Sequence, residues 1–366
     1  MSAPGRAARA SIGMATLAMA LAAACAGETR AARTPLVDAE PVDTGDDGAG
    51  RLLRELELEV LASYQRYTHD TSAAATAVDP AVGLTALGVA PDEVGASGGL
   101  AGRWPVTEVD GQPVEVVSRA LELHLSADRT VGWTFDQISL RLRVCGRIAT
   151  LPLRVAQVYV RDSERWTLVS EHLGYAQPMG RWLDAATGPL GSPMPGAIER
   201  HPAAEAVLAV VAGAFAVDGE RARTWDAGAD ALAIWPDPLQ LLRGGAVRTG
   251  PDLAASLGAT GVRLEGARLA LSPSRQVAFA ATTLLVSAAR ADGADGPVDV
   301  RLRATVVLER GAGQADPWRV RMAMVSAPIT VRTLVARTLG VIATAVTGSR
   351  VTARCTDGAG AVARVP

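Results

Sequence analysis

One histidine in the first half of the chain could carry acid–base chemistry. His172 lies in "RWTLVSEHLGYA", which is expected to form a strand whose alternate side chains share one face. Strict alternation places His172 beside Trp166 and Ser170, on the face that we expect to point into the domain. An imidazole there could act as a general base or donate a hydrogen bond to a bound carbonyl group. Trp133 is a further candidate for the pocket wall. The candidate partner of His172 is Asp136, which alternation places on the opposite face of its own strand from Trp133.

Three other polar side chains could line the same pocket. Tyr64 and Tyr67 belong to an apolar stripe at helical spacing, and Gln157 lies on the strand before that of His172. In an enzyme, a tyrosine or Asp136 would orient the imidazole. The alternative is a polar network, or a pocket for a small apolar or carbonyl-bearing ligand, without catalysis. We favour this alternative, because polar pockets carry chemistry in only some proteins.

Several other kinds of chemistry are excluded by what the chain lacks. The sequence contains no lysine and no P-loop, G-x-S-x-G, H-E-x-x-H or G-x-G-x-x-G motif. Its histidines and cysteines show no metal-ligand spacing, so we expect neither a metal nor a cofactor. The formal net charge of −2 argues against a nucleic acid as partner.

The strands around His172 belong to a weak internal repeat. "LELHLSADRTVGWTFDQ" aligns without gaps with "ARLALSPSRQVAFAATT", and "LRVAQVYVR" aligns with "LRATVVLER". Each copy continues into a strand that begins with tryptophan. Three matches in the same order indicate a duplicated domain. In the second copy Met322 and Met324 replace Ser170 and His172, so we expect a polar first pocket and a filled second one.

Each copy begins with helical periodicity and continues as alternating strands. This order predicts an α+β fold, with helices packed on one face of a curved antiparallel sheet. The charged turn, tryptophan and terminal "H-x-G" of the first copy, with the stretch "GVAPDEVGASGG", resemble the SnoaL-like branch of the NTF2-like superfamily. The resemblance implies two NTF2-like (cystatin-like) cone folds in tandem, each with an enclosed pocket. It places the first domain at residues 49–180, a linker at 181–200 and a divergent second domain at 201–330.

The N-terminal residues are predicted to direct export. Residues 1–24 combine two arginines with a short apolar stretch, which is typical of a signal peptide. The ending "LAAAC" resembles a bacterial lipobox with Cys25 as the lipidated residue, and residues 25–48 read as a flexible tether. We expect a lipoprotein of the periplasm or cell surface, attached to the membrane through its lipid only. Ordinary cleavage would instead give a soluble secreted or periplasmic protein.

The C-terminal part of the chain leaves two questions open. Cys145 and Cys355 remain as a pair in an oxidising compartment, so a disulfide between them is allowed, and the alternative is two buried thiols. Residues 331–366 form a tail that either packs back across the domains or supplies an oligomer interface.

The sequence thus predicts an exported, lipid-anchored tandem protein. We expect it to serve as a small-ligand-binding or assembly module, with its pocket in the first domain. Two alternatives stay open: an enzyme of cyclase, isomerase or dehydratase type that uses His172 with Asp136, and a purely structural lipoprotein. A homodimer is a further expectation, and in the structural alternative the second domain would supply its face.

Overall fold

The structure, a computed structural model, describes most of the chain after residue 46. The described residues are 47–69, 84–96, 104–162, 164–177, 193–194, 197–198, 202–217, 221–288, 296–311, 313, 316–347 and 349–354. Residues Gly48–Pro366 form one compact unit. The predicted signal peptide, Cys25, nearly all of the tether, most of the linker, the side chain of Tyr67 and Cys355 lie outside the described residues. None of the described helices is both long and apolar enough to cross a membrane.

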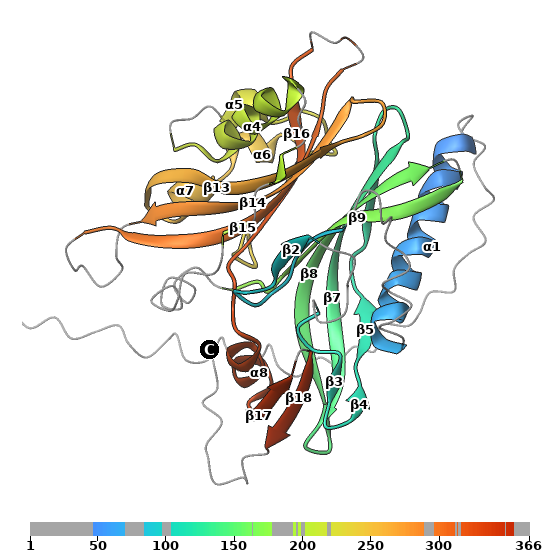
Figure 1. Ribbon diagram of the computed structural model, residues 1–366, viewed down its shortest axis with the longest axis vertical. Coiled ribbons are helices and arrows are strands. Elements are labelled where there is room, and N and C mark those ends of the chain that lie inside the picture. The colour runs from blue at the N-terminus through green and yellow to red at the C-terminus, as the bar shows by residue number, and fades with distance from the viewer. Residues whose placement is uncertain are drawn as a thin grey trace, which may run out of the picture. The chain divides into compact units, whose positions relative to one another are not determined.

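The first half, residues 47–177, is a seven-stranded sheet with a long helix along one face (Figure 1). The helix α1 (Asp47–His69) buries Leu52, Leu56, Val60 and Tyr64, which recur every fourth residue on one stripe. The strand order is β2-β1-β9-β8-β7-β5, and β6 also pairs with β7. The strands are β1 (Thr85–Leu87), β2 (Val94–Ala96), β5 (Glu115–Ser118), β6 (Glu122–Leu125), β7 (Val131–Val144), β8 (Arg147–Asp162) and β9 (Arg165–Gly174).

The second half, residues 197–329, is a second seven-stranded sheet with four described helices. Its order is β10-β13-β14-β15-β16-β11-β12. The strands are β10 (Ala197–Ile198), β11 (Leu232–Ile234), β12 (Leu241–Arg243), β13 (Ala259–Leu271), β14 (Val277–Ala288), β15 (Val298–Glu309) and β16 (Arg319–Ser326), and the helices are α4 (Pro202–Phe215), α5 (Arg221–Thr224), α6 (Ala246–Thr249) and α7 (Leu253–Ser256). The predicted α+β class is therefore seen, with more sheet than helix.

The two sheets share one pattern of strand pairing. The row Thr134–Gln157–Glu171 crosses β7, β8 and β9, and its counterpart by the sequence repeat is the row Ala280–Val306–Ala323 across β14, β15 and β16. In both sheets a short strand pairs in parallel with the last long strand: β1 pairs with β9, and β11 pairs with β16.

The turn that precedes β7 in the first half and β14 in the second half is also built twice. Arg129 and Arg275 both adopt a left-handed backbone with φ of 59°. The hydroxyl of Ser126 accepts a hydrogen bond from the N–H of Val131, as the hydroxyl of Ser272 does at the same place in the second half. The repeat in the sequence therefore corresponds to a repeat of hydrogen-bonding detail.

The two sheets pack against each other, with their helices on the outer sides. Side chains of both sheets form one shared apolar cluster, which contains no helix residue: Val131, Trp133, Phe135, Ala156, Val158, Val169, Leu232, Ile234, Val277, Phe279, Val307, Met322 and Met324. The side chains of α1 and of α4 belong to two other clusters, one inside each half. Each sheet is thus covered by helix on one face and by the other sheet on the opposite face.

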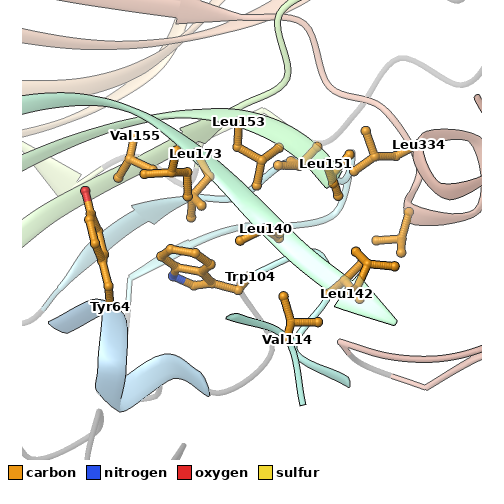
Figure 2. Close-up of a cluster of buried hydrophobic side chains, with 14 of the residues drawn as sticks. Tyr64, Trp104, Val114, Leu140, Leu142, Leu151, Leu153, Val155, Leu173 and Leu334 are labelled. Atoms are coloured by element: carbon orange, nitrogen blue, oxygen red, sulfur yellow. The ribbon is translucent and has the colours of Figure 1, made fainter. Parts of the chain in front are cut away.

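The C-terminal segment returns to the first half. It comprises α8 (Val331–Leu339), β17 (Ile342–Thr347) and β18 (Arg350–Arg354), and β18 joins the hairpin of β3 (Glu108–Val109) and β4 (Gln112–Pro113) in a four-stranded sheet. Leu334, Val335 and Val351 are buried in the core of the first half. Figure 2 shows Leu334 at one end of that core and Tyr64 at the other. Of the two roles predicted for the tail, the structure shows packing back across the chain.

Candidate functional site

A β-bulge in β9 decides which side chains face the interior. Val158 pairs with Ser170 but Tyr159 pairs with Leu168, so Val169 is an extra residue. The bulge reverses the alternation, and residues beyond it face the side opposite to the one that strict alternation predicts. The prediction that His172 and Ser170 share the face of Trp166 is therefore wrong. The second half has the same bulge at Arg321, so Met322 and Met324 likewise fill the contact between the sheets rather than the second interior.

His172 lies between the two sheets, fully buried. Its Nε2 is 2.8 Å from the hydroxyl oxygen of Ser326, on β16 of the second half. Burial, together with the positive charge of Arg303, lowers the pKa of His172 to about 3. The imidazole is therefore neutral at ordinary pH and is directed away from the interior of the first half. This position does not allow it to act as a base on a ligand held under α1.

The predicted site residues divide between two places. His172, Ser170 and Trp133 face the contact between the sheets, where Trp133 belongs to the shared apolar cluster. Tyr64, Gln157, Trp166 and Asp136 lie in the interior of the first half, beneath α1. Four of the predicted site residues therefore lie together in the interior of the first half, and His172 is not among them.

The interior contains a polar row across three neighbouring strands. Thr134, Gln157 and Glu171 are paired directly across β7, β8 and β9, and each is at most 1% exposed. The side-chain amide of Gln157 donates to the Glu171 carboxylate at 3.0 Å, and its oxygen accepts from the Tyr159 hydroxyl at 3.0 Å. This row, which we call the polar row, replaces apolar side chains at the centre of the sheet.

A buried tyrosine and a buried aspartate lie next to the polar row. The Asp136 carboxylate accepts hydrogen bonds from the backbone N–H of Ala120 at 3.1 Å and of Arg119 at 3.4 Å. Its other oxygen and the Tyr64 hydroxyl are buried without a hydrogen-bond partner within the described residues, and the charge of Asp136 acts on that hydroxyl. Burial raises the pKa of Asp136, although its hydrogen bonds act in the opposite direction. Burial, followed by the charge of Asp136, raises the pKa of Tyr64 well above its usual value. The tyrosine therefore keeps its proton and remains a hydrogen-bond donor.

Sequence reasoning missed Glu171, because strict alternation turned it toward solvent. A signal was nevertheless present. In the internal alignment Glu171 corresponds to Ala323, and a carboxylate aligned with an alanine marks a position where the two stretches differ in chemistry. Gln157, which the sequence did select, has Val306 as its counterpart.

The interior of the second half is apolar at the matching positions. Ala280, Val306 and Ala323 form its central row, and each is at most 1% exposed. Asp136 is replaced there by Thr282, whose hydroxyl donates to the backbone oxygen of Gly266 at 2.7 Å. Phe215, Trp225 and Trp235 pack edge to face in the same core.

Two further features bear on the chemistry. Within the described residues, no group of three or more histidine, cysteine, aspartate or glutamate side chains could hold a metal ion. Cys145, in the turn between β7 and β8, is disulfide-bonded, and its partner lies outside the described residues. The pairing of Cys145 with Cys355 stays a prediction.

No protein-family model matches the chain. The chain also matches no curated protein.

Comparison with solved structures finds proteins of the NTF2-like superfamily. An NTF2-like protein from Salmonella enterica is 14% identical and covers 34% of this chain and 87% of its own, with a TM-score of 0.27. A protein from Shewanella frigidimarina assigned as a ketosteroid isomerase is 11% identical over 35% of this chain and 96% of its own, with a TM-score of 0.27. The CaMKII hub of S. rosetta is 18% identical over 36% of this chain and 99% of its own, with a TM-score of 0.26. Each likeness covers about one-third of this chain.

Proposed function

We propose that the chain is a small-ligand-binding protein built from two SnoaL-like, NTF2-like domains in tandem, and that only the first domain has a site. The two halves have the same strand pairing, the same bulge and the same turn, which supports the tandem arrangement. The proposed domains are residues 49–180 and 201–330, and the C-terminal segment completes the core of the first.

The polar row is the observation that carries the proposal. Burying amide, hydroxyl and carboxyl groups costs free energy unless each finds a partner. The second half builds the same sheet with alanine and valine at these positions, so the fold itself does not require them. Within the described residues the Thr134 hydroxyl and the Trp166 indole N–H have no hydrogen-bond partner, although both are buried. Buried groups of this kind are normally satisfied, so we infer that a bound molecule completes them.

The surroundings of the polar row indicate the chemistry of the ligand. Tyr64 offers a hydroxyl that stays protonated, and Glu171 and Gln157 offer acceptors. Figure 2 shows Tyr64 beside Trp104, with Leu140, Leu153 and Leu173 forming an apolar wall nearby. The combination suits a small molecule with an apolar body and one end that carries carbonyl or hydroxyl groups.

Native mass spectrometry of the full chain purified from its own host tests the proposal. We expect a retained ligand in the wild type, and its loss in the triple variant Thr134→Val, Gln157→Leu, Glu171→Leu, without loss of stability. The reason is that apolar residues of similar volume relieve a desolvation cost that the hydrogen bonds of Gln157 offset only in part and the ligand offsets further. Thr282→Val, in the half without the row, is the matched control and keeps the ligand. If the wild type carries no ligand and the triple variant is less stable, the row is a structural network.

An enzymatic role would need other groups than the sequence suggested. A cyclase, isomerase or dehydratase that uses His172 is not supported, because this side chain is sealed between the sheets. The pair of Asp136 and Tyr64 is the arrangement in this interior with which a proton could be exchanged. We give ligand binding precedence, because it needs the polar row alone.

Export and lipid anchoring belong to the same proposal. Residues 1–24 would be the signal peptide and Cys25 the acylated residue, which places the protein at the membrane of the periplasm or at the cell surface. The disulfide bond of Cys145 supports an oxidising compartment. Labelling of cells with a palmitate analogue tests the anchor: the wild type should be labelled and Cys25→Ala should not. Label on the variant, or none on the wild type, would refute lipidation at this residue.

A further inference from the structure

The contact between the two sheets is built from two equivalent halves. On the first side, Arg154 donates to the backbone oxygens of Trp235 at 2.7 Å, Asp237 at 3.2 Å and Pro238 at 2.8 Å. On the second side, Arg303 donates to the backbone oxygens of Gly88 and Ala90.

These arginines occupy the same position in the repeat, and so do their acceptors. Arg154 and Arg303 each follow a leucine in the aligned strands β8 and β15. Gly88 and Trp235 each come directly after the short parallel strand, β1 or β11. Each half therefore contributes one buried arginine to the contact, and its own backbone oxygens accept hydrogen bonds from the arginine of the other half. Reciprocal contacts of this kind are the signature of a two-fold interface between identical subunits, here within one chain.

The equivalence breaks at the ends of β9 and β16. The repeat matches His172 with Met324 and Gly174 with Ser326. Across the interface His172 bonds to Ser326, whereas a Cβ atom added to Gly174 would lie 2.8 Å from both Met324 Cε and Ser326 Cβ. Only one of the two facing positions can therefore carry a side chain.

We infer that these four residues make each sheet face specific for the other half and unsuited to a copy of itself. Two first halves would place each His172 opposite a glycine, so that Nε2 would be buried without the serine hydroxyl. Two second halves would place serine against serine in the space where one Cβ fits, and each methionine would overlap a neighbour. The polar pair His172–Ser326 and the close-packed pair Met324–Gly174 both form only when unlike halves meet.

It follows that the partner of each sheet face is the other half. The two sheet faces fit each other in shape, and each would clash with, or leave a buried group unpaired against, a copy of itself. Such a contact selects one partner by excluding the others. A homodimer of the full chain would then use a different surface, because both sheet faces are already covered. This inference does not depend on ligand binding in the first half.

Exchange of residues between the halves tests the inference in the full-length chain. Gly174→Ser alone introduces the overlap and should lower the midpoint of thermal unfolding by about 5 °C. The pair His172→Met, Gly174→Ser makes the two faces alike and should be less stable still. Adding Met324→His and Ser326→Gly restores unlike faces with their roles reversed, and should recover most of the lost stability.

Gly174→Ala gives a graded control, because it adds the Cβ without the hydroxyl and should cause part of the serine effect. Circular dichroism confirms that each variant folds, and analytical ultracentrifugation reports its oligomeric state. A fourfold variant no more stable than the double variant would overturn the inference. So would a double variant as stable as the wild type, or a wild-type dimer that the double variant abolishes.

Discussion

The two halves of this chain have the same framework and opposite interiors. Below α1 the first half holds Thr134, Gln157 and Glu171 in one row, and the second half holds Ala280, Val306 and Ala323 in the matching row. Both rows are buried to the same degree. The difference teaches that strand pairing and bulges specify where a row lies, whereas its chemistry is free to change once the fold no longer depends on it.

The strongest way to break the comparison is to make the second interior polar. Ala323→Glu places a carboxylate in a core without the glutamine that Glu171 has, and we expect it to destabilise the protein by about 4 kcal/mol or more. Glu171→Ala, at the matching position, should cost only about 1–2 kcal/mol. Urea unfolding of the two variants measures both values. Equal losses would mean that the second interior accommodates polar groups as the first does.

The two buried arginines should be of equal importance if the contact is reciprocal. Arg154 and Arg303 are 5% and 2% exposed, and each satisfies backbone oxygens of the other half. Arg154→Met and Arg303→Met should each lower the unfolding free energy by about 3 kcal/mol, because buried acceptors lose their donor. Arg141→Met removes an exposed ion pair and serves as control, with an expected change within about 0.5 kcal/mol. A large effect in one half only would contradict reciprocity.

The histidine gives one half a dependence on pH that its methionine counterpart lacks. The pKa of His172 is about 3 in the folded protein and about 6.5 in the unfolded chain. The unfolded chain alone therefore takes up a proton as the pH falls below 6.5. Stability should drop by about 1.6 kcal/mol between pH 6.5 and 5, with a slope that approaches about 1.4 kcal/mol per pH unit at the lower pH.

Urea unfolding at both pH values measures this loss. Arg303 is the charged group that acts on His172, and it stays protonated throughout this range. His172→Met should remove a large part of the difference between the two pH values, whatever its effect on absolute stability. His124, whose pKa is also lowered by burial, contributes to the remainder. An unchanged pH dependence in this variant would show that the imidazole is charged, or exposed, in the folded protein.

The smallest expected effect concerns the arginine that lies over each conserved tryptophan of the repeat. Arg310 lies 5.1 Å from the ring centre of Trp318, and Arg161 lies 6.0 Å from that of Trp166. Arg310→Met and Arg161→Met should each cost about 0.5–1 kcal/mol, with the larger loss in the second half, where the contact is closer. Thermal unfolding of the two variants shows which one loses more stability. A larger loss for Arg161→Met than for Arg310→Met would contradict the prediction.

Much of the framework could be predicted, because a repeat is visible in the order of residues. The repeated strands followed from the aligned stretches, and the α+β order followed from helical periodicity that precedes alternating strands. The contrast between a polar and an apolar half was expected from Ser170 and His172, which lie instead between the sheets. The contrast that the structure shows is carried by Thr134, Gln157 and Glu171. The site was only partly predictable. Alternation assigned Gln157 and Trp166 to the interior, but one extra residue at Val169 turned His172 out of it and Glu171 into it. A bulge depends on hydrogen bonds between strands, which residue spacing along one strand does not reveal.

By itself the sequence indicated where the repeated strands lie and that two stretches of the chain share one residue pattern, because side-chain periodicity and internal similarity are properties of the order of residues. Tertiary structure alone decided which face of each sheet is an interior and which is a contact. It also decided that the two arginines reach across that contact, and that the tail closes the first core. These outcomes depend on which surfaces meet, and burial changes the free energy of a side chain only after they have met.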